Sequence, residues 1–205
     1  HRSDYIPGTG YEIVPETEGT VLDEGMVMEA IVRGVENLTP SLNLDELGCY
    51  EKPAVTSQEE ALIRERDARN RYVNLTVTYT FGEQTQILDG SQICQWLSWD
   101  GENIQVDETA VADFVSGLAK EHNTAYTTRN FVTSYKKTVP VSGSYGWRIN
   151  QSQETAELMA VLAAGESTTR EPVYSQTAAS HKAPDYGNSY VEVNLTAQHL
   201  FLYKD

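Results

Sequence analysis

Cysteine is rare in this chain, which has only Cys49 and Cys94 in 205 residues. Two thiols without a Cys-x-x-Cys pair cannot by themselves form a structural zinc site, which excludes that kind of small metal-stabilised domain. One alternative is a disulfide between Cys49 and Cys94, if the protein is exported to an oxidising compartment. The other, which the usual burial of free cysteine favours, is two buried thiols.

Positive charge is also scarce, because the chain has 15 Lys and Arg residues against 30 Asp and Glu residues, which gives a net charge of −15. Proteins that bind nucleic acids or anionic lipid surfaces usually have clustered Lys and Arg, so neither is predicted as a partner. No apolar run approaches the roughly 18 residues that a membrane-spanning helix needs. The histidines, His1, His122, His181 and His199, are scattered without ligand spacing, so no metal site is predicted.

Motifs of catalysis are missing as well. There is no Gly-x-Ser-x-Gly elbow and no glycine-rich phosphate loop. A reactive cysteine needs an accessible, electropositive environment, whereas Cys94 is expected on a buried helix face and Cys49 has no histidine near it in sequence. The acidic pair Asp107 and Glu108 suits a helix N-terminus. The sequence therefore predicts no catalytic residue and no cofactor.

Two hydrophobic periodicities are present and alternate along the chain. Apolar residues alternate with threonines over 74–81, which predicts a half-buried strand with 84–88 as its hairpin partner. After Asp107, apolar residues recur at helical spacing. Further helices are predicted at 23–35, 57–72, 89–97 and 152–164, and further strands at 11–14, 41–44, 129–133, 138–141, 145–149 and 168–174. Without regular βαβ spacing, this mixture predicts an α+β fold with antiparallel sheets and several packed helices.

The character of the chain changes after residue 175. Residues 176–188 are rich in Ser, Ala, Gly and Pro and lack periodicity, which is typical of a linker. Residues 189–205 predict a two-stranded hairpin. Because such a hairpin is marginal alone in water, we expect it to be the truncated start of a second domain. The predicted order is an accessory domain at 5–175, the linker at 176–188 and this hairpin at 189–205.

Aromatic residues interleaved with arginines are the best candidates for a binding surface. Aromatic faces and planar guanidinium groups together suit sugars or peptide carboxylates. The alternative is that the aromatic side chains belong to the core and that the arginines are solvated or paired with acids. The candidate ligand-binding residues are Trp99, Tyr126, Arg129, Tyr145, Trp147 and Arg148.

Several segments, taken in order, resemble a known family. They are Gly10-Tyr-Glu-Ile-Val-Pro-Glu16, Cys49-Tyr-Glu-Lys-Pro53, Val77-Thr-Tyr-Thr-Phe-Gly82, Leu88-Asp-Gly90, Tyr145-Gly-Trp-Arg-Ile149 and Thr169-Arg-Glu-Pro-Val-Tyr-Ser175. Over about residues 5–180, the chain resembles the peptidoglycan-binding domain that precedes the catalytic domain in bacterial L,D-transpeptidases of the YkuD (ErfK/YbiS) family. Residues 190–205 are similar to the first hairpin of that family's catalytic domain.

The resemblance implies a region of an enzyme that cross-links peptidoglycan stem peptides through a cysteine. The family's Ser/Thr-His-Gly-Cys motif is absent, because Lys182 follows Ser180 and His181. This stretch is therefore expected to lack transpeptidase activity, while the full-length protein is expected to be a Cys-dependent L,D-transpeptidase. The implied partners are peptidoglycan and the protein's own catalytic domain. The implied location is extracytoplasmic, at the cell wall, with a membrane anchor in an N-terminal segment outside this sequence.

The resemblance leaves three hypotheses for the domain's role. A binding module would hold glycan or stem peptide in an open groove that includes Tyr145, Trp147 and Arg148. A structural spacer would bury those aromatic side chains and have no cleft. A protein-interaction domain would expose an apolar patch.

Overall fold

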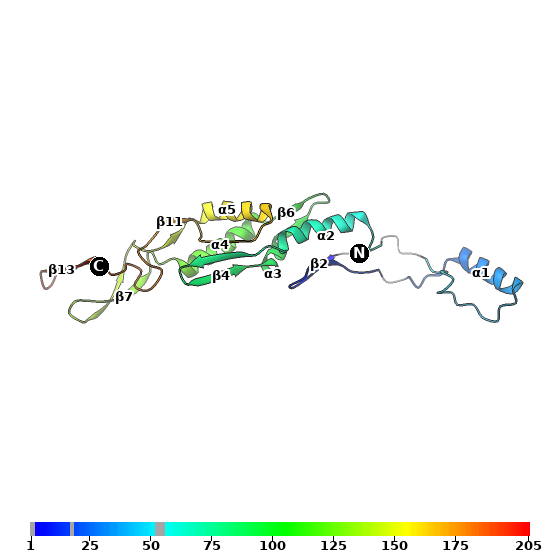
Figure 1. Ribbon diagram of the computed structural model, residues 1–205, viewed down its shortest axis with the longest axis horizontal. Coiled ribbons are helices and arrows are strands. Elements are labelled where there is room, and N and C mark those ends of the chain that lie inside the picture. The colour runs from blue at the N-terminus through cyan, green and yellow to red at the C-terminus, as the bar shows by residue number, and fades with distance from the viewer. Residues whose placement is uncertain (1–2, 17–18, 52–55) are drawn as a thin grey trace. The chain divides into compact units, whose positions relative to one another are not determined.

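The computed structural model describes residues 3–16, 19–51 and 56–205. The chain divides into two compact units, His1–Ala68 and Arg69–Asp205. Helices and small sheets are mixed in the order that Figure 1 shows, so the predicted α+β class is confirmed. In the described ranges, no helix is long and apolar enough to cross a membrane.

The first unit contains a small hairpin and one amphipathic helix. The hairpin pairs β1 (Ser3–Ile6) with β2 (Gly10–Ile13). Helix α1 (Glu24–Glu36) begins where predicted, because the Asp23 side chain accepts a hydrogen bond from the Met26 N–H. The predicted strand at 41–44 is wrong. Leu42 lies against Gly34 of α1, and the Asn43 side chain accepts from the Asp45 N–H, which starts a turn instead.

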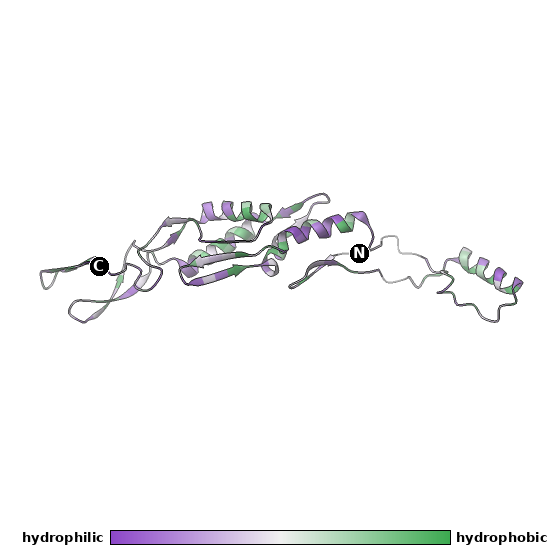
Figure 2. Cartoon of the chain, in the orientation of Figure 1, coloured by the Kyte–Doolittle hydropathy of each residue, from purple (hydrophilic) through white to green (hydrophobic). Residues whose placement is uncertain are grey.

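Helix α2 (Glu60–Val73) begins at Glu60, slightly later than predicted. Figure 2 shows it as almost entirely hydrophilic, whereas α4 (Glu108–His122) and the C-terminal half of α5 (Gln151–Ala164) are largely hydrophobic. The last two helices therefore form much of the second unit's core, and they pack against each other. Their best-buried apolar residues are Val111, Val115, Leu118, Leu158 and Leu162.

A three-stranded sheet in the order β10-β3-β4 completes this core. The alternation predicted for β3 (Val77–Phe81) is confirmed, since Val77, Tyr79 and Phe81 are buried and the threonines between them are half-buried. Strand β4 (Gln84–Leu88) returns as the predicted hairpin partner. On its other side, β3 pairs in parallel with β10 (Thr168–Arg170). One strand of this sheet is thus parallel, unlike the antiparallel pairs that the sequence predicts.

A buried acid, Glu154 of α5, ties the sheet to the helices. Its carboxylate accepts from the Tyr79 hydroxyl at 2.6 Å and from the Val173 N–H at 2.6 Å. Arg170 of β10 donates to both of its oxygens, at 2.6 and 3.1 Å. Glu154 is completely buried, and its charge is balanced by this two-pronged ion pair. Burial, followed by the contact with Glu154, raises the pKa of Tyr79.

Several shorter elements surround this core. The predicted helix at 89–97 is divided into α3 (Gly90–Ile93) and a 3-10 turn, Cys94–Trp96. The small sheets pair β5 (Leu97–Trp99) with β6 (Ile104–Val106), β7 (Thr128–Val132) with β8 (Thr138–Ser142), β9 (Arg148–Ile149) with β11 (Tyr174–Gln176), and β12 (Tyr190–Asn194) with β13 (His199–Tyr203).

The strand predicted at 145–149 is shorter than expected, because its first half contacts the 124–126 loop instead of a neighbouring strand. Gly146 has a φ of 139°, and a Cβ atom there would collide with the backbone nitrogen of Ala125. The Trp147 carbonyl accepts from the N–H groups of Thr124 and Ala125. Only Arg148 and Ile149 remain for the strand β9.

Residues 176–188 make specific contacts with the rest of the second unit. The Ser180 carbonyl accepts from the Trp147 indole N–H at 2.8 Å. His181 stacks on the same indole with ring centroids 3.7 Å apart. Asp185 forms an ion pair with Arg129 of β7. The division into an accessory domain, a linker and a second domain stays a prediction.

Candidate binding groove

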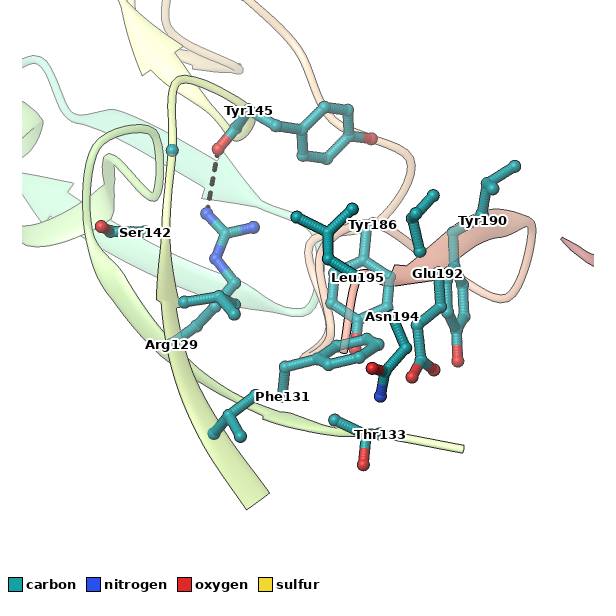
Figure 3. Close-up of a pocket in the computed structure, with 15 residues that line it drawn as sticks. Arg129, Phe131, Thr133, Ser142, Tyr145, Tyr186, Tyr190, Glu192, Asn194 and Leu195 are labelled. Atoms are coloured by element: carbon teal, nitrogen blue, oxygen red, sulfur yellow. Dashed lines mark hydrogen bonds between the residues drawn. The ribbon is translucent and has the colours of Figure 1, made fainter. Parts of the chain in front are cut away.

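A groove in the second unit lies between the β7–β8 hairpin and strand β12 (Figure 3). Its volume is about 660 Å³, within the usual range for ligand sites. Residues 191–195 all line it, although successive side chains of a strand point to opposite faces. The groove therefore follows the length of this segment. The residues that line this β7–β12 groove are Arg129, Phe131, Thr133, Val139, Val141, Ser142, Gly143, Tyr145, Tyr186, Tyr190, Val191, Glu192, Val193, Asn194 and Leu195.

Strand register builds one wall of the groove. Arg129 and Phe131 are two residues apart on β7 and therefore project to the same face. Their antiparallel partners on β8 are Val141 and Val139. Thr133 continues the same alternation into the turn. The wall is thus an apolar strip with a guanidinium group near one end.

Arg129 is fixed at this end by three acceptors. Its Nη1 donates to Asp185 Oδ1 at 2.5 Å, and its Nη2 donates to the carbonyls of Thr124 and Tyr145 at 2.8 and 2.9 Å. Asp185 is buried and also accepts from the Thr124 hydroxyl at 2.5 Å. The charge of Arg129 is therefore balanced. Its Nε–H and its second Nη1–H have no acceptor among the described residues, so two donors remain available to a ligand.

Glu192 lies on the opposite wall and is only 8% exposed. Its two oxygens accept from the Ser134 N–H at 3.2 and 2.9 Å, and Oε2 also accepts from the Ser134 hydroxyl at 2.7 Å. Because that hydroxyl gives its single proton to Glu192, it accepts from the Tyr203 hydroxyl 2.6 Å away. These bonds connect the β7–β8 turn with the β12–β13 hairpin.

Aromatic rings surround Tyr190 at the base of the groove. Tyr190 meets Phe131 edge-on at 5.8 Å, meets Tyr186 edge-on at 5.1 Å and stacks on Tyr203 at 4.6 Å. Burial raises the pKa of the Tyr190 hydroxyl, and the neighbouring tyrosines and Glu192 raise it further. The groove therefore has an aromatic base in which added negative charge is unfavourable.

Only part of the predicted aromatic and arginine set meets in this groove. Arg129 and Tyr145 line it, and Figure 3 shows the hydrogen bond between the Arg129 guanidinium and the Tyr145 carbonyl. Tyr126 and Arg148 instead form a pair, with the guanidinium carbon 5.7 Å from the ring centre. Neither of these two residues lines the groove.

Trp147 and Trp99 lie outside the groove lining. One face of the Trp147 indole is covered by His181, and Tyr174 packs against it with ring centroids 4.8 Å apart. Trp147 is therefore a packing residue and not an open platform. Trp99 lies on β5, opposite Ile104 of β6.

Cys49, in the first unit, and Cys94, in the second, are both free thiols, and a disulfide between them stays a prediction. Cys49 is buried, whereas Cys94 is half-buried. The Cys94 thiol donates to the Ser91 carbonyl at 3.3 Å. Among the described residues, no group of three or more His, Cys, Asp or Glu side chains could hold a metal ion.

Of the residues that line the groove, the sequence predicted only Arg129 and Tyr145. Those not predicted include its other aromatic residues and its one acid, namely Phe131, Tyr186, Tyr190 and Glu192. Phe131 could have been found, because it alternates with Arg129 on a predicted strand. Tyr186 falls in the predicted linker and the other two in the predicted hairpin. Nothing local indicates that these segments meet β7.

Comparison with known proteins agrees with the motif resemblance. Residues 63–170 match a family model described as "Putative peptidoglycan binding domain". No curated protein matches the chain. The solved structures that it resembles include the Ldtfm–avibactam carbamoyl enzyme, with 29% identity and a TM-score of 0.54 over 70% of this chain. A cysteine-to-serine mutant of the Enterococcus faecium L,D-transpeptidase is also similar, with 30% identity and a TM-score of 0.51 over 66% of this chain.

The present chain spans 57% and 55% of those two proteins, a little over half of their length. The family match covers more than half of the present chain, including the sheet and both core helices of the second unit. The chain therefore belongs to the family of peptidoglycan-binding domains.

Proposed function

We propose that this chain is the accessory region of a cell-wall L,D-transpeptidase and that it holds peptidoglycan in the β7–β12 groove. Family membership and the similarity to two L,D-transpeptidase structures support this function. The observation that carries it is the groove itself, where aromatic rings meet a guanidinium group with two free donors. Rings suit the apolar faces of sugars, and guanidinium suits the carboxylates of stem peptides.

In this proposal the chain itself is not catalytic. Burial raises the pKa of the Cys94 thiol, whereas a nucleophilic cysteine needs a lowered pKa. Cys49 is 1% exposed and out of reach of a substrate. The reaction would belong to a catalytic domain that begins with residues 189–205, following the accessory domain at 5–175 and the segment at 176–188. The protein would work outside the cytoplasm, at the cell wall, anchored to the membrane by a preceding segment.

The proposed role toward the catalytic domain is positioning. The bonds of Ser134 with Glu192 and Tyr203 link the accessory domain's β7–β8 turn to the hairpin. The ion pair of Arg129 with Asp185 holds the connecting segment against β7. Such contacts would present a bound peptidoglycan strand at a fixed place relative to the hairpin.

The test is co-sedimentation of the chain with purified insoluble peptidoglycan over a salt series. We expect saturable retention that survives moderate salt, because ring stacking is not screened by ions. Tyr145→Ala should lower retention several-fold, since this ring lines the groove. Tyr126→Ala is the matched control, because Tyr126 is also an exposed tyrosine but lies outside the groove lining. Equal retention of both variants and the parent chain would exclude the groove as the binding site.

A structural spacer is the second candidate, and the packing of Trp147 favours it. The spacer hypothesis expects this aromatic side chain to be covered, as it is by His181 and Tyr174. It also expects no cleft, which the β7–β12 groove opposes. If the chain stays in the supernatant while a known wall-binding protein sediments, the spacer function is the better one.

A further inference from the structure

The β7–β12 groove holds one buried carboxylate, Glu192, that forms no ion pair with any of the described residues. At the end of the groove where Arg129 lies, the carboxylate of Asp185 forms an ion pair with Arg129. Glu192, on the opposite wall, accepts only from the Ser134 N–H and hydroxyl, which are neutral donors. In the described part of the chain, no Lys, Arg or His forms an ion pair with Glu192, although Lys136 and Lys137 belong to the same turn as Ser134. Buried charges in proteins are normally paired, so a cation is the ligand that this site lacks.

The carboxylate is placed to receive such a ligand. Tyr190, Glu192 and Asn194 alternate on β12 and therefore share one face of the strand. Figure 3 shows the Glu192 carboxylate and the Asn194 amide directed to the same side, next to the Tyr190 ring. Glu192 Oε1 accepts a single bond, at 3.2 Å, so it retains capacity for a strong donor.

The surrounding groups favour a cation that is attached to an organic chain. Phe131, Tyr186 and Tyr190 line the groove, and aromatic rings attract an ammonium group and its methylene groups. Val139 and Val193 also line the groove and add apolar surface. A small hydrated metal ion would find one carboxylate and no further acid here, which is poor coordination. A primary ammonium on a flexible stem matches both the charge and the apolar walls.

We propose that Glu192 is the subsite for the side-chain ammonium of a peptidoglycan stem peptide. This inference rests on the proposed function, and it assigns the stem peptide, as opposed to the glycan, to the groove. The free donors of Arg129 would take a carboxylate of the same peptide. Arg129 lies on β7, and Thr133, four residues later, directly follows this strand, so the two ends are separated by roughly 13 Å at the rise of a strand. An extended peptide of a few residues spans that distance.

The experiment is titration calorimetry with two soluble muropeptides that differ in one group. The first has a free amine on the side chain of its diamino acid, and the second has that amine acetylated. We expect the parent chain to bind the free amine at least about tenfold more tightly, because a charge-assisted hydrogen bond with Glu192 is lost on acetylation. This ligand-side comparison uses the unaltered chain, so it does not depend on the folding of any variant.

Glu192→Gln tests the same bond from the protein side. It should weaken binding of the free amine to the level of the acetylated peptide and leave the acetylated peptide unaffected. Glu157→Gln is the matched control, because it removes the same charge from an exposed position on α5.

Two results would overturn the inference in different ways. If both muropeptides bind equally to the parent chain and to Glu192→Gln, the ammonium subsite is excluded while peptidoglycan binding stands. If neither muropeptide binds and the chain also fails to sediment with intact peptidoglycan, the proposed function fails together with the inference.

Discussion

Glu154 and Glu192 are both buried glutamates of the second unit, yet their surroundings differ in one respect. Glu154 is completely buried and has a cation, Arg170, on both of its oxygens. Glu192 is 8% exposed, and among the described residues its hydrogen-bond donors are the N–H and hydroxyl groups of Ser134. Glu154 lies in the core between α5 and β10, whereas Glu192 lies in the β7–β12 groove. The difference indicates that the first acid stabilises the fold and that the second is available to a partner.

The largest expected effect on stability comes from breaking the buried ion pair of Glu154 with Arg170. Arg170→Met removes the cation and leaves Glu154 buried with an unpaired charge. Breaking such a pair from one side typically costs about 3–5 kcal/mol of unfolding free energy. Urea unfolding followed by circular dichroism measures it, with Arg148→Met as the control, because Arg148 is exposed. A loss no larger than that of the control would show that Glu154 does not depend on its cation.

A smaller loss of stability is expected when the ion pair of Arg129 with Asp185 is broken. Asp185→Asn removes the charge that balances Arg129 and weakens the bonds to Arg129 and Thr124. We expect a loss of about 1–3 kcal/mol, typical of a buried hydrogen bond to a charged group. The same unfolding experiment applies, with the exposed Asp113→Asn as the matched control. If Asp185→Asn is neutral, residues 176–188 are not held by this ion pair.

Glu192→Gln should change the unfolding free energy by less than about 1 kcal/mol, because the amide oxygen can still accept from Ser134. The loss of unfolding free energy should therefore be much smaller for Glu192→Gln than for Arg170→Met. A loss of several kcal/mol would mean that Glu192 is a structural acid like Glu154. Stability would then account for its burial, and the ammonium site would lose its main support.

The smallest effect concerns His122, a partly buried group with a neutral partner, the Gln86 amide oxygen, at 3.0 Å. Burial lowers the pKa of His122. The charge of Glu121 offsets part of this effect by raising the pKa, and the nearby His181 lowers it again. Below the ordinary histidine pKa of about 6.5, the unfolded chain therefore binds a proton that the folded chain resists. Stability should be complete above that pH and decline as the pH falls from there toward the folded pKa. Thermal unfolding at about pH 7.5 and about pH 5.5 measures the decline. It should be smaller in His122→Gln, and an equal decline in both chains would contradict the assignment.

Local signals were sufficient where neighbouring residues determine the structure. Helix α4 begins at Asp107 because its side chain accepts from the N–H groups of Thr109 and Ala110. Helix α5 ends at Gly165, which adopts a φ of 72° that other residues rarely adopt. Strand β3 follows from strict alternation over 74–81. The two cap contacts lie within four residues of each other, and the β3 alternation lies within one short segment, so the sequence pattern contains the information.

The sequence thus determined the α+β class, the main helices and strands, and the family through motifs spread along the chain. The tertiary structure alone decided that β10 joins β3 in parallel, that His181 covers Trp147, that Asp185 pairs with Arg129 and that Ser134 donates to Glu192. Each of these contacts joins residues more than thirty positions apart. Their formation depends on how the hairpins and helices pack together, and no local periodicity encodes that packing.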